Sequence, residues 1–158
     1  MRSSFALLGG VVAVVLLPAG QVYAAPPGPD DPSGDDILSY PLAEGDYSVH
    51  GTSNFGWVFF TTPDGVGCGI APNGGPAGCD AVPPGAPAGT NQTVATSWAA
   101  GQFRSSDTPT FTRAAAVLPR GQRVQTLGGA CAIDEQGAVH YESGSHGFIL
   151  AADRGVLW

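Results

Sequence analysis

The chain contains no lysine, and its few charged residues are mainly acidic. All six basic residues are arginines, against thirteen aspartates and glutamates, which gives a formal net charge of −7 at pH 7. Proteins that bind nucleic acid or anionic membrane surfaces need clusters of basic side chains to neutralise phosphate groups. The composition therefore excludes nucleic acid as a partner and argues against anionic lipid surfaces.

Several short catalytic motifs are also absent. The sequence has no Gly-x-Ser-x-Gly nucleophile elbow, no phosphate-binding loop, no dinucleotide-binding glycine fingerprint and no Cys-x-x-Cys pair. These patterns are typical of α/β-hydrolases, NTPases, nicotinamide enzymes and thiol–disulfide oxidoreductases. We therefore expect no cofactor and a non-enzymatic protein.

Long apolar runs are missing except at the amino terminus. There, residues 5–17 follow the positive charge of Arg2, and residues 22–24 (Val-Tyr-Ala) offer small or apolar side chains where a signal peptidase cuts. The run is shorter than the ~20 residues that a membrane-spanning helix needs. We interpret residues 1–24 as a cleavable signal peptide and predict a secreted or cell-envelope protein with no membrane span after cleavage.

The next segment, residues 25–36, has only proline, glycine, alanine, serine and aspartate. This composition predicts a disordered acidic leader, because nothing in it can anchor a core. The remaining residues, 37–158, are enough for a single domain and not for two. A preference for alanine, glycine, proline and arginine over lysine and asparagine suggests an actinobacterial source.

Long charged side chains, which favour helices, are scarce, whereas glycine and proline are abundant. Charged residues make up 12% of the chain, against 24 glycines and 14 prolines. This composition disfavours helices and favours short strands joined by tight turns. We predict an all-β fold, a small sandwich or open barrel of about seven to nine short strands with Gly/Pro-rich loops.

Hydrophobic alternation and β-branched side chains indicate where the strands lie. The strongest signal covers residues 57–62, followed by a Pro-Asp-Gly turn and a return strand over residues 66–70. Residues 71–90 are expected to form one long irregular loop, and Gly101 is expected to interrupt a strand pair. Further strands are expected over residues 47–51, 93–98, 102–104, 123–127, 130–133, 138–141 and 148–150.

Two stretches together resemble a family of exported actinobacterial proteins of unknown function. Its members carry Phe-x-Thr/Ser-Pro-Ser-x-Asn-Ile-x-Cys, then a second cysteine followed by an acidic residue. Near the C-terminus they carry two cysteines around a glycine turn, then Gly-His-Gly-Phe-x-Leu. Here residues 60–68 read Phe-Thr-Thr-Pro-Asp-Gly-Val-Gly-Cys and precede Cys79-Asp80, while Cys131 precedes a glycine turn and residues 145–150 read Ser-His-Gly-Phe-Ile-Leu.

The resemblance covers roughly residues 57–80 and 128–158 and implies two disulfides without implying an activity. The chain has three cysteines, and an exported domain meets an oxidising environment in which pairing is the default. With the family pattern behind it, we expect a disulfide between Cys68 and Cys79. Closing the flexible loop between them is worth roughly 3 kcal/mol in the chain-entropy model.

This chain departs from the family pattern at two places. Residues 64–66 (Asp-Gly-Val) replace the usual polar turn, and the fourth cysteine is missing, because Tyr141 or His140 stands there. The third cysteine, Cys131, is therefore expected to be a buried free thiol. An intermolecular disulfide and a reactive group are the alternatives.

The histidines are the remaining candidates for chemistry. The spacing of His140 and His146 is not a recognised ligand spacing, so no metal is expected. If the domain has a site, we expect it at His146, Glu142 and His140. The alternative function is a small extracellular hydrolase that uses His146 with Glu142 or Asp134.

Aromatic side chains are numerous for a domain of this size. Most of them are expected in the core, but an exposed aromatic face would bind an envelope glycan, lipid or protein. The leading hypothesis is therefore a secreted or cell-envelope-associated β domain with a non-enzymatic binding or structural role. The aromatic residues considered are Trp57, Phe59, Phe60, Trp98, Phe103, Phe111, Phe148 and Trp158.

Overall fold

The computed structural model describes residues 36–48 and 55–158. The expected signal peptide and nearly all of the acidic leader lie outside the described residues, as do His50 and most of the strand expected over residues 47–51. The first described element is a short 3-10 helix, η1 (Ile37–Ser39), which Asp36 caps by accepting a hydrogen bond from the backbone N–H of Leu38.

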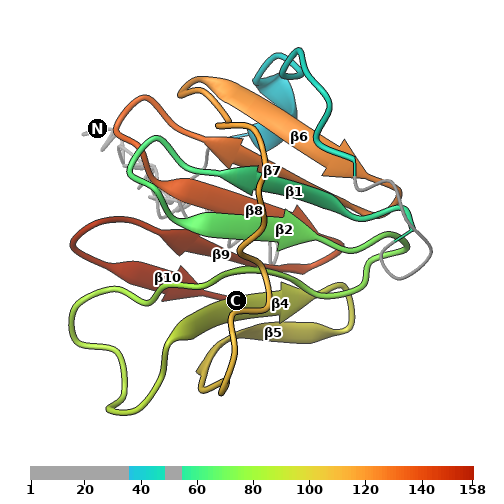
Figure 1. Ribbon diagram of the computed structural model, residues 1–158. Helices are drawn as coiled ribbons and strands as arrows, with labels where there is room; N and C mark the ends of the chain where they lie inside the picture. The colour runs from blue at the N-terminus through green and yellow to red at the C-terminus, as the bar shows by residue number, and fades with distance from the viewer. Residues whose placement is uncertain (1–35, 49–54) are drawn as a thin grey trace, which may run out of the picture.

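The described residues form an all-β sandwich of two five-stranded antiparallel sheets (Figure 1). Within each sheet, strands that are consecutive in sequence are neighbours, so both sheets are simple meanders. The first sheet comprises β1 (Val58–Thr61), β2 (Gly67–Ile70), β3 (Ala77–Cys79), β4 (Gln92–Thr96) and β5 (Ala99–Arg104). The second comprises β6 (Gln122–Thr126), β7 (Gly129–Ile133), β8 (Val139–Ser143), β9 (His146–Leu150) and β10 (Gly155–Leu157).

The all-β prediction is confirmed, while two local expectations are wrong. The segment expected as one irregular loop contains β3, which pairs with β2 on one side and β4 on the other. Gly101 does not break a strand, because β5 runs through it and the chain turns instead at Ser97–Trp98. With the additional strands β3 and β10, the described part has ten strands.

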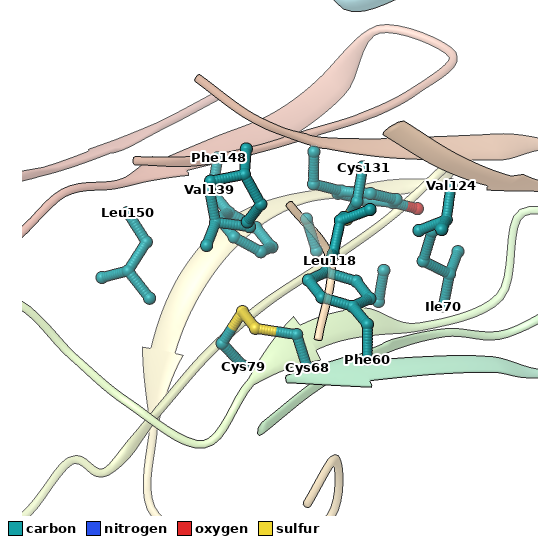
Figure 2. Close-up of a cluster of buried hydrophobic side chains, with 14 of the residues drawn as sticks. Phe60, Cys68, Ile70, Cys79, Leu118, Val124, Cys131, Val139, Phe148 and Leu150 are labelled. Atoms are coloured by element: carbon teal, nitrogen blue, oxygen red, sulfur yellow. A yellow bond between two sulfur atoms is a disulfide. The ribbon is translucent and has the colours of Figure 1, made fainter. Parts of the chain in front are cut away.

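Large apolar side chains from both sheets fill the space between them (Figure 2). Phe60 and Ile70 come from the first sheet and Tyr141 and Phe148 from the second, and all four are almost completely buried. Alternation along each strand explains this arrangement, since every second side chain faces the opposite sheet. Leu118, which lies between β5 and β6 in sequence, completes the core.

The long connection from β5 to β6 crosses the outer face of the first sheet, as the yellow-to-orange trace in Figure 1 shows. We call residues 105–118 the strap. Its Phe111 is fully buried, and a Cβ at Gly78 would lie 2.7 Å from the Phe111 ring. The strap therefore lies close to the sheet because glycine stands beneath it, a close approach that a larger residue would prevent.

Irregular segments bond to the outer strands of both sheets. Backbone hydrogen bonds join β1 to Tyr47 and Ala116, and β6 to Pro41 and Ala43. On the other side of the sandwich, the carbonyl of Trp158 accepts from Gly101 in β5 and Gly147 in β9. The chain thus supplies hydrogen-bond partners to three of its outer strands, β1, β5 and β6.

Candidate binding surface

The strand register keeps the expected catalytic groups apart. His146 lies opposite Ser143 at one end of β8, whereas Asp134 lies in the β7–β8 turn at the other end. Glu142 precedes Ser143, so alternation places its side chain on the opposite face of the sheet from that of His146. The structure therefore does not bring His146 together with either carboxylate, and the hydrolase alternative lacks its base–acid pair.

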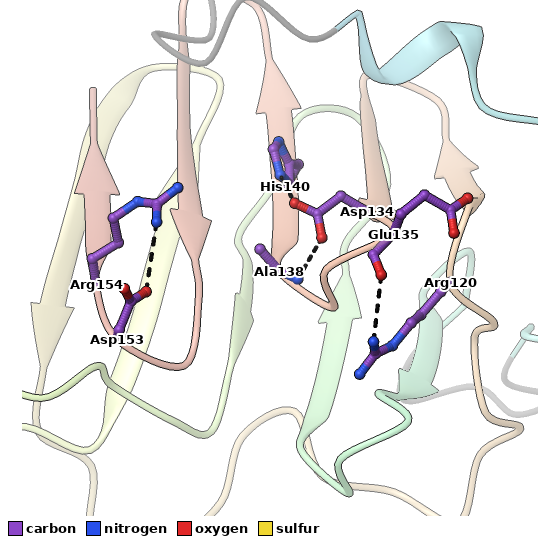
Figure 3. A network of polar contacts seen from close by, with 7 residues as sticks. All are labelled: Arg120, Asp134, Glu135, Ala138, His140, Asp153 and Arg154. Carbon is purple, nitrogen blue, oxygen red and sulfur yellow. Dashed lines mark hydrogen bonds and ion pairs between the residues drawn. The ribbon is translucent and has the colours of Figure 1, made fainter.

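Asp134 and His140 are in contact, but the Asp134 carboxylate also caps the β7–β8 turn. One carboxylate oxygen of Asp134 accepts from the backbone N–H of Ala138 at 2.8 Å, and the other lies 3.0 Å from Nε2 of His140 (Figure 3). His140 is 2% exposed, so substrate cannot reach it. Among the described residues, no group of three or more His, Cys, Asp or Glu side chains gathers to hold a metal ion.

The cysteines separate into a pair and a single thiol. The sulfur atoms of Cys68 and Cys79 are 2.09 Å apart, joining β2 to β3, and Cys131 is buried without a disulfide partner among the described residues. Burial raises the pKa of the Cys131 thiol far above its ordinary value, so the thiolate that a reactive cysteine needs is suppressed. This environment supports the buried-thiol interpretation over the reactive one.

The register shows which residue lies opposite Cys131. Cys131 lies directly opposite Tyr141, as Cys68 lies directly opposite Cys79. The flanking backbone hydrogen bonds make both positions non-hydrogen-bonded pairs, the type in which opposing side chains are closest. Tyr141 is fully buried, and burial raises its pKa to about 12. Tyr141, and not His140, therefore occupies the partner position.

We expect Tyr141→Cys to form a second disulfide with Cys131. The cavity left by the tyrosine ring costs about 3 kcal/mol, and closing the loop offsets about the same amount. Thiol alkylation of the unfolded, unreduced protein should then find no free cysteine. His140→Cys is the matched control, because His140 lies opposite Ala132; it should leave two thiols reactive. Two reactive thiols in the Tyr141→Cys variant would contradict the register.

At one end of the sandwich, three tight hairpin turns present exposed side chains. The turns follow β4, β6 and β8 and comprise Ser97–Trp98, Leu127–Gly128 and Gly144–Ser145. Trp98 is 67% exposed and Leu127 77% exposed, and Phe55, just before β1, is 85% exposed. These are the three most exposed large apolar side chains in the described part of the chain.

One loop between β2 and β3, residues 71–76, holds these segments together. The backbone N–H of Asn73 donates to the carbonyl of Leu127, and that of Ser97 donates to the carbonyl of Gly74 at 3.0 Å. A Cβ at Gly56, next to Phe55, would lie 3.1 Å from the ring of Pro72. We call Phe55, Trp98 and Leu127, with residues 71–76 between them, the apolar end.

The apolar end carries no formal charge. Its loop and the three turns consist of glycine, proline, alanine, serine, asparagine, leucine and tryptophan. Backbone hydrogen bonds and two-residue turns hold it in one arrangement, so a ligand would bind with little ordering cost. The charged turns, with Asp64, Asp134 and Asp153, lie at the opposite end of the strands (Figure 1).

No family model, curated protein or solved structure matches the chain. In the described residues, no helix has the length and apolar character that crossing a membrane requires.

Most aromatic side chains are predicted to lie in the core, and Phe59, Phe60, Phe111 and Phe148 are buried. Neither Phe55 nor Leu127 was predicted as a site residue; a large apolar residue in a two-residue turn beside glycine is the available signal for Leu127.

Proposed function

We propose that this chain is an exported, non-catalytic domain of the cell envelope that binds uncharged glycan through its apolar end. The observation that carries the proposal is the exposure of Trp98 at the tip of a hairpin turn that bonds to the same loop, residues 71–76, as the turn of Leu127. The resemblance to exported proteins of unknown function supports the location. The single disulfide, Cys68–Cys79, fits an oxidising compartment.

The chemistry of the apolar end favours sugar rings over other ligands. A pyranose ring presents a face of C–H groups, which packs on an aromatic ring, and a rim of hydroxyls, which bond to uncharged polar groups. Asn73 and Ser97 supply such groups beside Trp98. The net charge of −7 disfavours anionic polymers and anionic lipid, because like charges repel.

Chitohexaose, an uncharged oligomer of N-acetylglucosamine, should bind the mature domain, and Trp98→Ala should weaken this binding at least tenfold. Loss of an exposed aromatic anchor removes most of a small interface's binding energy, and about 1.4 kcal/mol corresponds to tenfold. Titration calorimetry measures both affinities. Leu42→Ala is the matched control, since Leu42 is also exposed, at 53%, but pairs with Arg123 near the start of β6, at the other end of this strand from Leu127; it should bind like the unchanged protein.

Three outcomes would count against the proposal. Equal affinities for the unchanged protein and Trp98→Ala would remove the apolar end as the site. Absence of binding to both chitohexaose and a neutral β-glucan hexamer would remove the glycan class. Binding of zwitterionic phosphatidylcholine vesicles through Trp98, without glycan binding, would replace glycan by lipid at the same surface.

A further inference from the structure

A cleft lies between the two sheets, at the end of the strands opposite the apolar end. It has a volume of about 590 Å³, within the range of small-molecule sites. Its apolar lining includes Val66 and Ala81 from the first sheet's side and Val139 and Leu150 from the second's. Val139 and Leu150 are core residues, so this part of the wall is already packed and fixed.

Two hairpin turns of the same construction flank the cleft. In the first, Thr62 Oγ1 accepts from the backbone N–H of Val66 at 3.0 Å; in the second, Asp134 Oδ1 accepts from that of Ala138 at 2.8 Å. In each turn a glycine N–H also bonds back to the carbonyl three residues earlier, at 2.9 and 3.0 Å. Each turn is thus stabilised by its own side-chain cap and does not depend on a ligand.

Arg120 links the two turns beside the cleft. Its guanidinium lies 3.9 Å from the carboxylate of Asp64 in the first turn and donates to the carbonyl of Glu135 in the second at 3.4 Å. Figure 3 shows this side chain extending toward the second turn. Arg120 therefore limits the spread of the turns on this side.

The charged side chains that line the cleft are mainly carboxylates. Asp64, Asp134 and Asp153 contribute three; Arg154 lies 3.6 Å from Asp153, and Arg120, beside the cleft, lies 3.9 Å from Asp64. Asp64 and Asp153 are well exposed, and the exposed ion pairs Asp64–Arg120 and Asp153–Arg154 rearrange at little cost, so both carboxylates are accessible to a ligand. The lining thus combines apolar walls with an excess of negative charge.

We propose that this cleft binds a small organic cation, a primary ammonium group on an apolar stem. The stem would occupy the space against Val66, Val139 and Leu150, and the ammonium would lie near Asp64 and Asp153. An anion of the same shape meets like charge there and is disfavoured. This site is separate from the glycan surface and does not rest on the proposed function.

The test uses three probes with one stem: 4-phenylbutylamine, 4-phenylbutan-1-ol and 4-phenylbutanoate. Each is titrated into the isotopically labelled mature domain, and backbone amide shifts of Gly137, Ala138 and Ala151 are followed, since these residues line the cleft. We expect the amine to bind most tightly and the carboxylate most weakly. The proposal would be overturned if the amine and the alcohol bound equally tightly, or if the carboxylate bound more tightly than the amine. It would also be overturned if none of the three probes shifted these amide signals.

Variants assign the charge preference to the cleft. Asp153→Asn and Asp64→Asn should each weaken the amine roughly three- to fivefold and leave the alcohol unchanged, as expected for an exposed charge pair. Asp107→Asn, an exposed carboxylate in the strap, is the matched control and should change neither. Trp98→Ala should also leave amine binding unchanged, so failure here and failure of the glycan proposal are distinguishable. If Asp107→Asn weakened amine binding to the same extent, the preference for the amine would arise from the overall charge of the protein, and the proposed site would be wrong.

Discussion

Replacing Asp80 by alanine should lower the free energy of unfolding by about 3 kcal/mol, because it removes the acceptor that holds the strap to the sandwich. The carboxylate of Asp80 accepts from the backbone N–H groups of Thr110, Phe111 and Thr112 at 3.0, 2.9 and 2.6 Å. It also accepts from the hydroxyl of Thr112 and the side-chain amide of Gln92. Alanine would leave these donors without that acceptor while Phe111 stays over the sheet.

Urea unfolding of the two proteins measures this loss. Asp107→Ala is the matched control, because Asp107 lies in the same strap and is exposed; its unfolding free energy should change by less than about 0.5 kcal/mol. Asp80→Asn should resemble the alanine variant, because an amide offers only one acceptor and turns a donor toward other donors. A loss below about 1 kcal/mol for both Asp80 variants would show that the strap is held by Phe111 alone.

The effect should also depend on pH. Burial by itself would raise the pKa of Asp80, but the hydrogen bonds from Thr110, Phe111 and Thr112 outweigh it and hold the pKa below the usual 3.8. A lowered pKa in the folded state stabilises the fold above the unfolded value and loses that contribution as pH falls through the lowered value. The difference between the unchanged protein and Asp80→Asn should therefore be constant above pH 5 and shrink below 3.8.

The second large effect is expected from the disulfide. Replacing both Cys68 and Cys79 by alanine should lower the free energy of unfolding by about 3 kcal/mol, because the unfolded chain regains the freedom of the closed loop. The bond joins two inner strands of the first sheet, at the end of their pairing away from the loop that precedes β3. Because β3 is only three residues long, its pairing depends on this restraint more than that of the other strands.

Thermal unfolding with and without a reducing agent provides the test. The reductant should lower the melting temperature of the unchanged protein and leave that of Cys68→Ala/Cys79→Ala unaltered. Cys131→Ala is the control, because it removes a buried sulfur atom without removing a disulfide. Reductant should lower its melting temperature by as much as that of the unchanged protein. A melting temperature that does not respond to reductant in the unchanged protein would mean that the bond contributes no stability.

The hairpins were predictable because local chemistry determines them. Gly65 and Gly137 adopt positive φ angles of 89° and 96° at the turns, a conformation that glycine reaches without strain, and apolar residues flank both turns. Strand β3 was not predictable, since two of its three residues, Ala77 and Gly78, have low strand propensity. These residues form a strand because β2 and β4 supply partners on both sides.

The candidate sites were less predictable than the fold. An exposed aromatic face could be anticipated, but Trp98 became its centre only because the chain turns at Ser97–Trp98 and not at Gly101. The cleft had no signal in the sequence, because its lining comes from loops that are far apart along the chain. The contact of Asp134 with His140 depends likewise on the register of β7 and β8.

The bonding of the outer strands has a consequence for self-assembly. At high local density, an unpaired strand would allow one copy of a protein to extend the sheet of the next into a fibril. Here Tyr47 and Ala116 occupy backbone positions along β1, Pro41 and Ala43 occupy those along β6, and Trp158 bonds to β5. In crowded copies, parts of β1, β5 and β6 are therefore already bonded within their own chain, which disfavours joining of sheets at these strands.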